Sequence, residues 1–185
     1  MNYQKTRKIM EAMFVTLVCI FLTIPNNVYA NVINKVHNKY MIEIKAEDER
    51  IIDEYIIEKN GIPYFDINKA YRENESEEIL DIGKSFNDFS FQMNSTEKIS
   101  SDENPFPVRG NWCGPYYGSG KPIDLLDEGC MIHDGCYEHG KKNCSCNNIL
   151  INHINRYYNQ MGSREKTMAW AIKLYFISEN KRDGC

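Results

Sequence analysis

The chain has 185 residues, of which 42% are hydrophobic and 26% are charged, and its formal net charge is −4 at pH 7. This length allows one domain with extensions, or two very small domains. The charge is unevenly divided, because residues 31–104 carry 9 Lys and Arg against 17 Asp and Glu, whereas residues 105–185 carry 10 against 8. An acidic segment without cysteine therefore precedes a mildly basic segment that is rich in cysteine.

The N-terminus has the pattern of a secretory signal peptide. Lys5, Arg7 and Lys8 precede an apolar run from about residue 12 to 24, and small residues follow near Ala30. The run is short for a transmembrane helix, and polar residues follow it abruptly. We expect residues 1–30 to be removed by a cut near Ala30 and the protein to be secreted; the alternative is an uncleaved N-terminal anchor.

Removal of that segment, which contains Cys19, leaves six cysteines. In an exported chain an even number of cysteines indicates a disulfide framework, with 15 possible pairings by counting alone. A zinc site formed by Cys130, His133, Cys144 and Cys146 is the alternative. It is disfavoured by the oxidising destination and by the lack of paired C-x2-C motifs. The six cysteines are Cys113, Cys130, Cys136, Cys144, Cys146 and Cys185.

The acidic segment contains signals of regular structure. Residues 47–59 place isoleucine and tyrosine at helical spacing, and Asn60-Gly61 would end that helix. Residues 62–67 predict a short extended piece, and residues 75–89 predict a second helix. We expect residues 31–104 to form either a small helical accessory domain or spacer, or a propeptide whose negative charge covers a basic surface.

A linker would join the two parts of the chain. Residues 94–107 are rich in Ser, Asp, Glu, Asn and Pro, which is typical of a linker. Arg109, just before the cysteine-rich part, is a candidate processing point. We therefore expect a boundary at residues 104/105.

A glycine-rich loop at residues 110–120 opens the second part and is anchored by Cys113. Glycines allow backbone carbonyls or amides to approach a ligand closely. No Lys-Ser/Thr pair follows, which excludes a phosphate-binding P-loop. Exposed carbonyls with a nearby carboxylate suit a hard cation, and outside the cell Ca2+ is the expected one.

Three helices are predicted after the loop. Two helices joined by a short connection pack antiparallel, which could bring Asn147 or Asn148 to the face of the first helix that carries His133. The predicted helices open at Pro122–Asp127 and end near His139-Gly140, run from about Asn147 to Met161, and run from Arg164 to Ser178.

The first of these helices contains the sequence Cys130-Met-Ile-His133-Asp134-Gly-Cys136-Tyr137. The two cysteines are six residues apart and lie on different faces of a helix, so they can attach it to two neighbours. His133 and Asp134 would then be held in a fixed orientation. Such an arrangement suits a site in which an imidazole and a carboxylate act differently on one substrate.

The run from Trp112 to Tyr137, with its glycine loop and its His-Asp-x-Cys-Tyr motif, resembles the calcium loop and active-site helix of secreted phospholipases A2. Cys144-Ser-Cys146 and the chain end at Cys185 are similar to the bee-venom-type branch and related bacterial enzymes. The resemblance covers roughly residues 110–185. It implies a mainly α fold, with a disulfide-bonded antiparallel helix pair and an N-terminal calcium-binding loop; residues 31–104 would add a small helical extension.

The resemblance also implies roles for individual catalytic residues. His133 would be the general base that takes a proton from water, and Tyr137 would belong to the hydrogen-bond network behind it. The Gly114 amide would bind the oxyanion. Asn147 stands where the family usually has an aspartate that orients the histidine; an amide can still accept a hydrogen bond, but it cannot stabilise an imidazolium by charge.

The implied cofactor is Ca2+. Asp134 would be its carboxylate ligand, joined by the backbone carbonyls of Trp112, Gly114 and Tyr116, and the ion would polarise the ester and hold the phosphate. Tyr116 stands where a glycine is common in the family. Because the ligand at this position is a backbone carbonyl, a tyrosine can supply it if its backbone angles fit.

The resemblance selects one set of disulfides among the fifteen, namely Cys113–Cys130, Cys136–Cys146 and Cys144–Cys185. A further bridge of the bee-venom-type branch would join positions 129 and 153. These positions are Gly129 and His153 here, so both partners of that bridge are absent together.

The implied function is calcium-dependent hydrolysis of the sn-2 ester of glycerophospholipids at a membrane surface, without spanning it. We expect no nucleic acid partner, and the sequence does not indicate the oligomeric state. The alternative is a catalytically weak or inactive phospholipase A2-like module that binds lipid or a protein receptor. A third hypothesis is that residues 31–104 silence the enzyme until they are removed.

Overall fold

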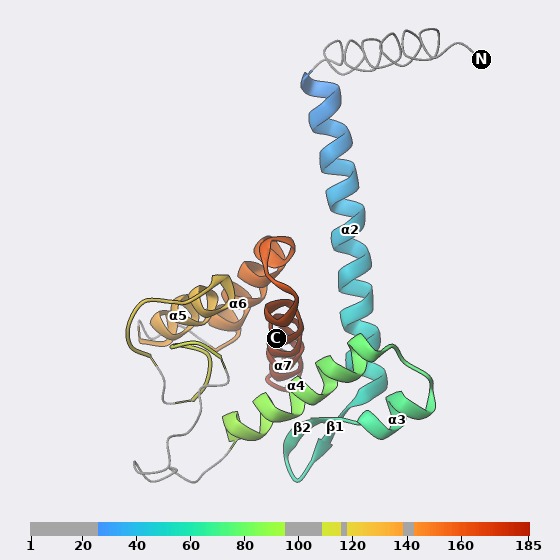
Figure 1. The fold of residues 1–185 in the computed structure, drawn as a ribbon, viewed down its shortest axis with the longest axis vertical. Helices are drawn as coiled ribbons and strands as arrows, with labels where there is room; N and C mark the ends of the chain where they lie inside the picture. The colour runs from blue at the N-terminus through green and yellow to red at the C-terminus, as the bar shows by residue number, and fades with distance from the viewer. Residues whose placement is uncertain (1–25, 95–108, 116–117, 139–142) are drawn as a thin grey trace, which may run out of the picture. The chain divides into compact units, whose positions relative to one another are not determined.

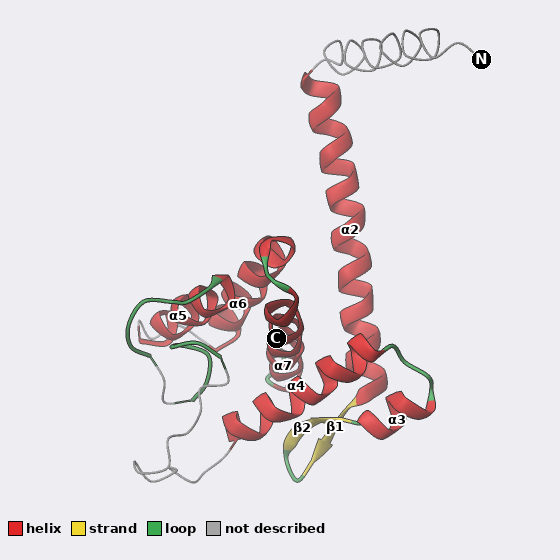
Figure 2. Cartoon of the chain, in the orientation of Figure 1, coloured by secondary structure: helices red, strands yellow, loops and turns green. Residues whose placement is uncertain are grey.

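The computed structural model describes residues 26–94, 109–115, 118–138 and 143–185, which belong to two compact units, residues 1–46 and 47–185 (Figure 1). The described residues are mainly helical (Figure 2). Their elements are α2 (Asn26–Tyr55), β1 (Ile56–Lys59), β2 (Ile62–Phe65), α3 (Ile67–Arg72), α4 (Glu77–Asn94), α5 (Leu125–Glu138), α6 (Asn143–Tyr157), the 3-10 turn η1 (Tyr158–Gln160) and α7 (Ser163–Arg182).

The predicted signal peptide falls almost entirely on residues 1–25, which lie outside the described residues, and Ala30 belongs to α2. No helix in the described ranges is both long enough and apolar enough to cross a membrane. Cleavage near Ala30 and secretion therefore stay predictions.

The helix predicted over residues 47–59 is wrong in its last four residues. The helix ends at Tyr55, and Ile56–Lys59 form β1, which pairs antiparallel with β2 so that Ile56 lies opposite Phe65. Asn60 and Gly61 have φ angles of 57° and 78°. Two central residues with positive φ are typical of the tight turn of a β-hairpin. The Asn-Gly pair is thus a hairpin turn and does not cap a helix. The extended piece predicted at residues 62–67 is confirmed over Ile62–Phe65 as β2, but its last two residues are wrong, because Asp66 caps α3 and Ile67 begins it.

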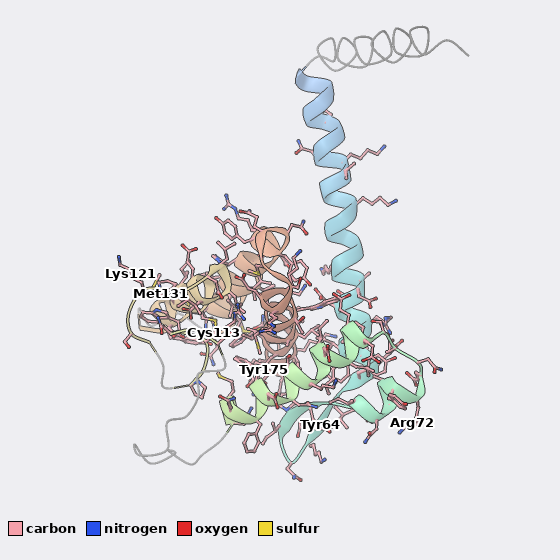
Figure 3. All side chains as sticks on the ribbon, viewed as in Figure 1. Tyr64, Arg72, Cys113, Lys121, Met131 and Tyr175 are labelled. Carbon is pink, nitrogen blue, oxygen red and sulfur yellow. A yellow bond between two sulfur atoms is a disulfide. The ribbon has the colours of Figure 1, made fainter. Side chains whose placement is uncertain are left out.

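An aromatic cluster joins α4 to α7. Phe86 and Phe89 of α4 contact the ring of Tyr175, and Phe89 also meets Phe176 edge-on, with ring centroids 5.9 Å apart. Figure 3 labels Tyr175 among the side chains that fill the space between the two helices. All four rings are buried, so burial of apolar surface supplies much of the stabilisation at this contact.

A buried ion pair joins the last part of α2 to α7. Lys173 Nζ lies 2.9 Å from Asp48 Oδ2, and Trp170 Nε1 donates a hydrogen bond to Asp48 Oδ1 at 2.8 Å. Burial raises the pKa of the Asp48 carboxyl and lowers the pKa of the Lys173 ammonium, while each charge partly offsets the burial of the other. Residues near position 48 are therefore integrated with the cysteine-rich part.

The structure places the described residues on both sides of the predicted boundary at 104/105 in one compact unit, residues 47–185. Arg109, the candidate processing point, pairs through its Nε and Nη2 atoms with Asp124 Oδ2 at 2.9 and 2.6 Å. Its backbone also exchanges hydrogen bonds with Cys113. The predicted linker is mostly residues outside the described ranges, and whether residues 31–104 are removed stays a prediction.

The three C-terminal helices are present, with shifted ends. The first begins at Leu125, after Asp124 accepts the backbone hydrogen bond of Asp127, rather than at Pro122. Helix α6 begins at Asn143, one turn earlier than predicted, so that Cys144 and Cys146 lie on it. Helix α7 continues past the predicted end at Ser178 to Arg182. His139 and Gly140 lie outside the described residues.

The disulfides are the three that the resemblance selects, Cys113–Cys130, Cys136–Cys146 and Cys144–Cys185. The positions of the absent fourth bridge are neighbours: a Cβ built on Gly129 would lie 2.7 Å from Cδ2 of His153. His153 uses Nε2 to donate a hydrogen bond to the Leu125 carbonyl at 2.7 Å. A histidine that packs on a glycine thus occupies the place of that bridge between α5 and α6.

Candidate active site

A cavity of about 620 Å3 lies in the unit of residues 47–185 and combines apolar and polar walls. Phe89 and Met93 of α4, Leu150 of α6 and Phe176 of α7 contribute apolar surface. The polar wall comes from α5 and the glycine-rich loop. Its members, with the remaining lining residues, are Trp112, Cys113, Gly114, Pro115, Gly118, Cys130, His133, Asp134, Tyr137 and Asn143.

His133 lines this cavity, although only 5% of its surface is exposed. Its ring packs edge-on against the rings of Tyr137 and Phe176, with centroid separations of 4.8 and 4.6 Å. On one side of the ring, Nε2 lies 3.0 Å from Asn147 Oδ1. On the other side, Nδ1 lies 3.7 Å from Asp134 Oδ1, which is too long for a hydrogen bond. The two ring nitrogens therefore have different environments.

Asn147 is the centre of a polar network behind His133. Its Oδ1 accepts a hydrogen bond from the Tyr137 hydroxyl at 2.9 Å, and its Nδ2 donates to Asn180 Oδ1 at 2.8 Å. Asn180 in turn donates to Asn148 Oδ1 at 3.0 Å. These partners orient the Asn147 amide with its oxygen toward His133. An amide oxygen only accepts, so the proton of neutral His133 lies on Nε2 and the lone pair of Nδ1 is available in the cavity.

Tyr137 remains a hydrogen-bond donor over a wide pH range. Its pKa is raised, first by burial and then by the negative charges of Asp134, Asp183 and Glu179. A neutral hydroxyl can donate to Asn147 Oδ1, whereas a phenolate cannot. The predicted positions of His133, Asn147 and Tyr137 therefore converge in the structure, while their catalytic roles stay predictions.

The glycine-rich loop is closed on itself beside this cavity. Asn111 Nδ2 donates to the Lys121 carbonyl at 2.8 Å, and Trp112 Nε1 donates to the Gly120 carbonyl at 3.1 Å. Gly114 has a φ of 144°, a conformation that side chains rarely adopt. Among the predicted ligands, Trp112, Gly114 and Asp134 all line the cavity, whereas Tyr116 lies outside the described residues.

The predicted ligands of the loop are oxygen atoms, of the kind that a hard cation prefers. In the described part of the chain no group of three or more His, Cys, Asp or Glu side chains could hold a metal ion. A site here would therefore depend on one carboxylate, Asp134, and on backbone carbonyls. Such an all-oxygen set is chemically suited to Ca2+. The zinc alternative is excluded, because Cys130, Cys144 and Cys146 are all in disulfides.

Three residues of the site were not identified from the sequence. Asn180 fixes Asn147, Phe176 packs on the His133 ring, and the Asp127 carboxylate accepts hydrogen bonds from the loop. Asn180 lies beyond the predicted end of its helix. Asp127 gave no distinct signal in the sequence, because an acidic residue is common in the first turn of any helix.

Parts of the chain are similar to phospholipases A2. It is 50% identical over 41 residues to basic phospholipase A2 nigroxin A of Micrurus nigrocinctus, covering 22% of this chain and 34% of the relative. It is 41% identical over 73 residues to phospholipase A2 of Bos taurus, covering 38% and 50%. It is 35% identical over 83 residues to the acidic phospholipase A2 homolog taipoxin gamma chain of Oxyuranus scutellatus scutellatus, covering 45% and 54%.

The chain thus spans between 34% and 54% of the length of these three relatives. No protein-family model matches the chain, and no solved structure matches it. For the matched part, these relatives support the phospholipase A2 family.

Proposed function

We propose that this protein hydrolyses the sn-2 ester of glycerophospholipids, in a calcium-dependent reaction, to a fatty acid and a lysophospholipid. One observation carries the proposal. His133 donates from Nε2 to Asn147 and leaves Nδ1 available beside the Asp134 carboxylate, in a cavity with an apolar wall. A fixed basic nitrogen next to an apolar wall suits hydrolysis of a lipid ester by water.

In this proposal His133 moves one proton. Nδ1 accepts it from a water molecule whose oxygen attacks the ester carbonyl carbon. When the bond between that carbon and the glycerol oxygen breaks, Nδ1 returns the proton to the leaving oxygen. Asn147 and Tyr137 hold the ring in the required orientation throughout. The Gly114 amide would donate to the oxyanion.

The residues that would hold Ca2+ are Asp134 and the carbonyls of Trp112, Gly114 and Tyr116. When bound, the ion supplies Lewis-acid polarisation of the ester carbonyl and a positive charge for the lipid phosphate. Support comes from the all-oxygen donor set and from the loop closure described above.

The remaining features belong to the same proposal. Phe89, Met93 and Phe176 form an apolar wall that an acyl chain could occupy. The disulfide Cys136–Cys146 and the His153–Leu125 hydrogen bond, at opposite ends of α5 and α6, favour the antiparallel helix pair. The protein would act at a membrane surface after secretion and removal of residues 1–30.

A second function is favoured by one residue. Asn147 is neutral, so it cannot stabilise a protonated His133 by charge, and the described network around it consists of amides and one hydroxyl. This observation favours a catalytically weak or inactive module that binds lipid or a protein receptor. Such a module would bind phospholipid vesicles without releasing products.

The products distinguish the two functions. Phospholipid vesicles are prepared with different labelled acyl chains at the sn-1 and sn-2 positions, and released fatty acids are identified by mass spectrometry in the presence of Ca2+. The proposal predicts release of the sn-2 chain together with an equal amount of sn-1 lysophospholipid. Binding to vesicles without release would favour the second function, and release of the sn-1 chain would contradict the proposed position of cleavage.

A further inference from the structure

The Asp127 carboxylate is fully buried in the first turn of α5, where it accepts hydrogen bonds from backbone N–H groups. The Asn111 N–H lies 3.0 Å from both carboxylate oxygens, and the Trp112 N–H donates to Oδ1 at 2.7 Å. The Ile123 N–H donates to Oδ2 at 2.9 Å. A buried carboxylate is costly unless it is well hydrogen-bonded, and here both oxygens are satisfied by the backbone.

These N–H groups come from the two ends of the glycine-rich loop. Asn111 and Trp112 lie at its start, and Ile123 lies where the chain enters α5. Asp127 therefore closes the loop at its base. Gly110 makes this contact possible, because its φ is +62° and a Cβ at that position would overlap the Asp127 carboxylate.

The same helix carries the proposed calcium carboxylate. Asp134 follows Asp127 by seven residues, which corresponds to about 10 Å along a rigid helix. The next residue after Trp112 is Cys113, which is bonded to Cys130 on α5. The Trp112 carbonyl thus lies between two attachments of the loop to α5. The N–H of Trp112 donates to Asp127, and the next residue, Cys113, is held by the disulfide.

We propose that Asp127 is a positioning residue for the calcium site: it holds the loop carbonyls at a fixed place relative to Asp134 without contacting the ion. This inference rests on the calcium site of the proposed function. Partners that orient metal ligands from outside the coordination shell contribute about 10- to 100-fold to metal affinity. Loss of one charged oxygen from this clamp should therefore weaken calcium binding rather than the chemical step.

The test compares Asp127→Asn with the wild-type chain and with Glu128→Gln. Glu128 is exposed and lies one residue further along the same turn, so its substitution removes the same charge without affecting the clamp. Calcium affinity is measured by isothermal titration calorimetry, and esterolysis is measured as a function of calcium concentration. We expect about tenfold weaker binding for Asp127→Asn, a kcat at saturating calcium that is close to wild type, and unchanged values for Glu128→Gln.

A merely structural role would give a different pattern, namely a lower melting temperature and kcat with unchanged calcium affinity, and that result would overturn the inference. If Asp127→Asn does not fold, amide hydrogen exchange on the calcium-free wild-type protein decides. The clamp predicts protected amides at Asn111, Trp112 and Ile123, and fast exchange at these amides would overturn it. Absence of calcium binding by the wild type would contradict the proposed function itself, whereas calcium binding that Asp127→Asn leaves unchanged would contradict only the role of Asp127.

Discussion

Asn147 supports His133 with an oxygen that carries no charge. The hydrogen bond to Nε2 still selects the tautomer and orients the ring, which a carboxylate would also do. What the amide lacks is the ability to stabilise the imidazolium that would form in the proposed reaction when His133 takes a proton. The proposed activity should therefore depend on residue 147 in two separable ways, through orientation of the ring and through charge.

Substitution of Asn147 tests both contributions. Asn147→Asp should raise kcat by about tenfold, equivalent to ~1.4 kcal/mol, because a carboxylate stabilises the protonated imidazole. Asn147→Leu should lower kcat by about 100-fold, because the ring loses its fixed tautomer and Tyr137 loses its acceptor. The measurement is the rate of fatty-acid release at saturating calcium and lipid.

Asn180 serves as the control for this series. In Asn147→Asp the amide of Asn180 must turn so that its Nδ2 donates to the new carboxylate. The amide of Asn148 must then turn as well, so that it donates to the Oδ1 of Asn180. Asn180→Asp combined with Asn147→Asp would place two carboxylates together and should cancel the gain. Equal kcat values for the wild type, Asn147→Asp and Asn147→Leu would show that residue 147 has no part in the reaction.

Tyr175 gives a residue-level prediction about pH. Burial raises its pKa to about 12, with the charge of Glu179 as a smaller cause, while in an unfolded chain a tyrosine titrates near ~10. A group whose pKa is higher in the folded state stabilises the fold below the unfolded pKa and loses that contribution as the pH rises toward the folded one. The free energy of unfolding should therefore fall between about pH 10 and 12.

Urea unfolding at several pH values measures this loss. Tyr175→Phe should make the decline less steep, because the remaining decline comes from other buried tyrosines. It should also cost about 1 kcal/mol at neutral pH, since Asn94 loses its contact with the hydroxyl. The same slope in the wild type and the variant would contradict the role assigned to Tyr175.

At the scale of elements, α7 is where the described N-terminal segment of residues 47–94 meets the helices that carry His133 and Asn147. It contacts α4 through the aromatic cluster, binds Asp48 of α2 through Lys173, and supplies Phe176 and Asn180 to the site around His133. Helix α7 therefore holds these three parts of the unit together. The ion pair is the most sensitive of these contacts, because both charges are buried.

Lys173→Met should destabilise the protein by about 3–5 kcal/mol, because the buried Asp48 carboxylate loses its cation. The double variant Asp48→Asn, Lys173→Met removes both charges and should recover a large part of that loss. Chemical denaturation monitored by tryptophan fluorescence measures both. Lys181→Met provides a matched control, since its ion pair with Asp53 is exposed and should contribute no more than ~1 kcal/mol. Equal losses for Lys173→Met and Lys181→Met would contradict this account.

Short-range sequence patterns predicted the helices of the cysteine-rich part well. Features that depend on long-range contacts could not be predicted in this way. Helix geometry and one short connection predicted that Asn147 or Asn148 meets the face of His133; the family resemblance selected Asn147, and the structure shows the contact of Asn147 with His133. Asn60-Gly61 could not be assigned from local sequence, because Asn-Gly ends helices and also forms hairpin turns. The choice depends on the pairing of Ile56–Lys59 with Ile62–Phe65.

Other parts of the fold and of the site depend on tertiary structure alone. Asp48 and Lys173 are 125 residues apart in the sequence, and no local signal joins them. No local signal joins Phe89 and Met93 to His133 either, although all three line the cavity. Phe89 and Met93 belong to the acidic, cysteine-free segment, for which the sequence suggested an accessory role. The resemblance covered only residues from about 110 onward and therefore could not include this wall.

For the whole molecule, the important consequence is that residues 47–94 form one unit with the cysteine-rich part. They supply an apolar wall of the cavity and the partner of Lys173. This arrangement favours a permanent structural role for these residues over the hypothesis that they silence the enzyme until removal.

A chain of residues 110–185 should fail to fold cooperatively, because it leaves Lys173 without Asp48 and exposes the apolar side of α7. A chain of residues 47–185 should retain cooperative unfolding and activity within about threefold of residues 31–185, because residues 31–46 belong to the other compact unit. A threefold change in rate corresponds to ~0.7 kcal/mol. Circular dichroism melting curves and lipid hydrolysis measure both. Activity of residues 110–185 equal to or above that of residues 31–185 would contradict this prediction and favour the silencing hypothesis.

The central claim is that His133 activates water beside a calcium ion held at Asp134 and the loop. Its most direct test is fatty-acid release from phospholipid vesicles by the wild-type protein with Ca2+ and with EGTA, and by His133→Gln with Ca2+. The account predicts release only by the wild type with Ca2+, while His133→Gln keeps a cooperative thermal transition. Release that is absent in all three reactions, or that continues in EGTA and in His133→Gln, would contradict it.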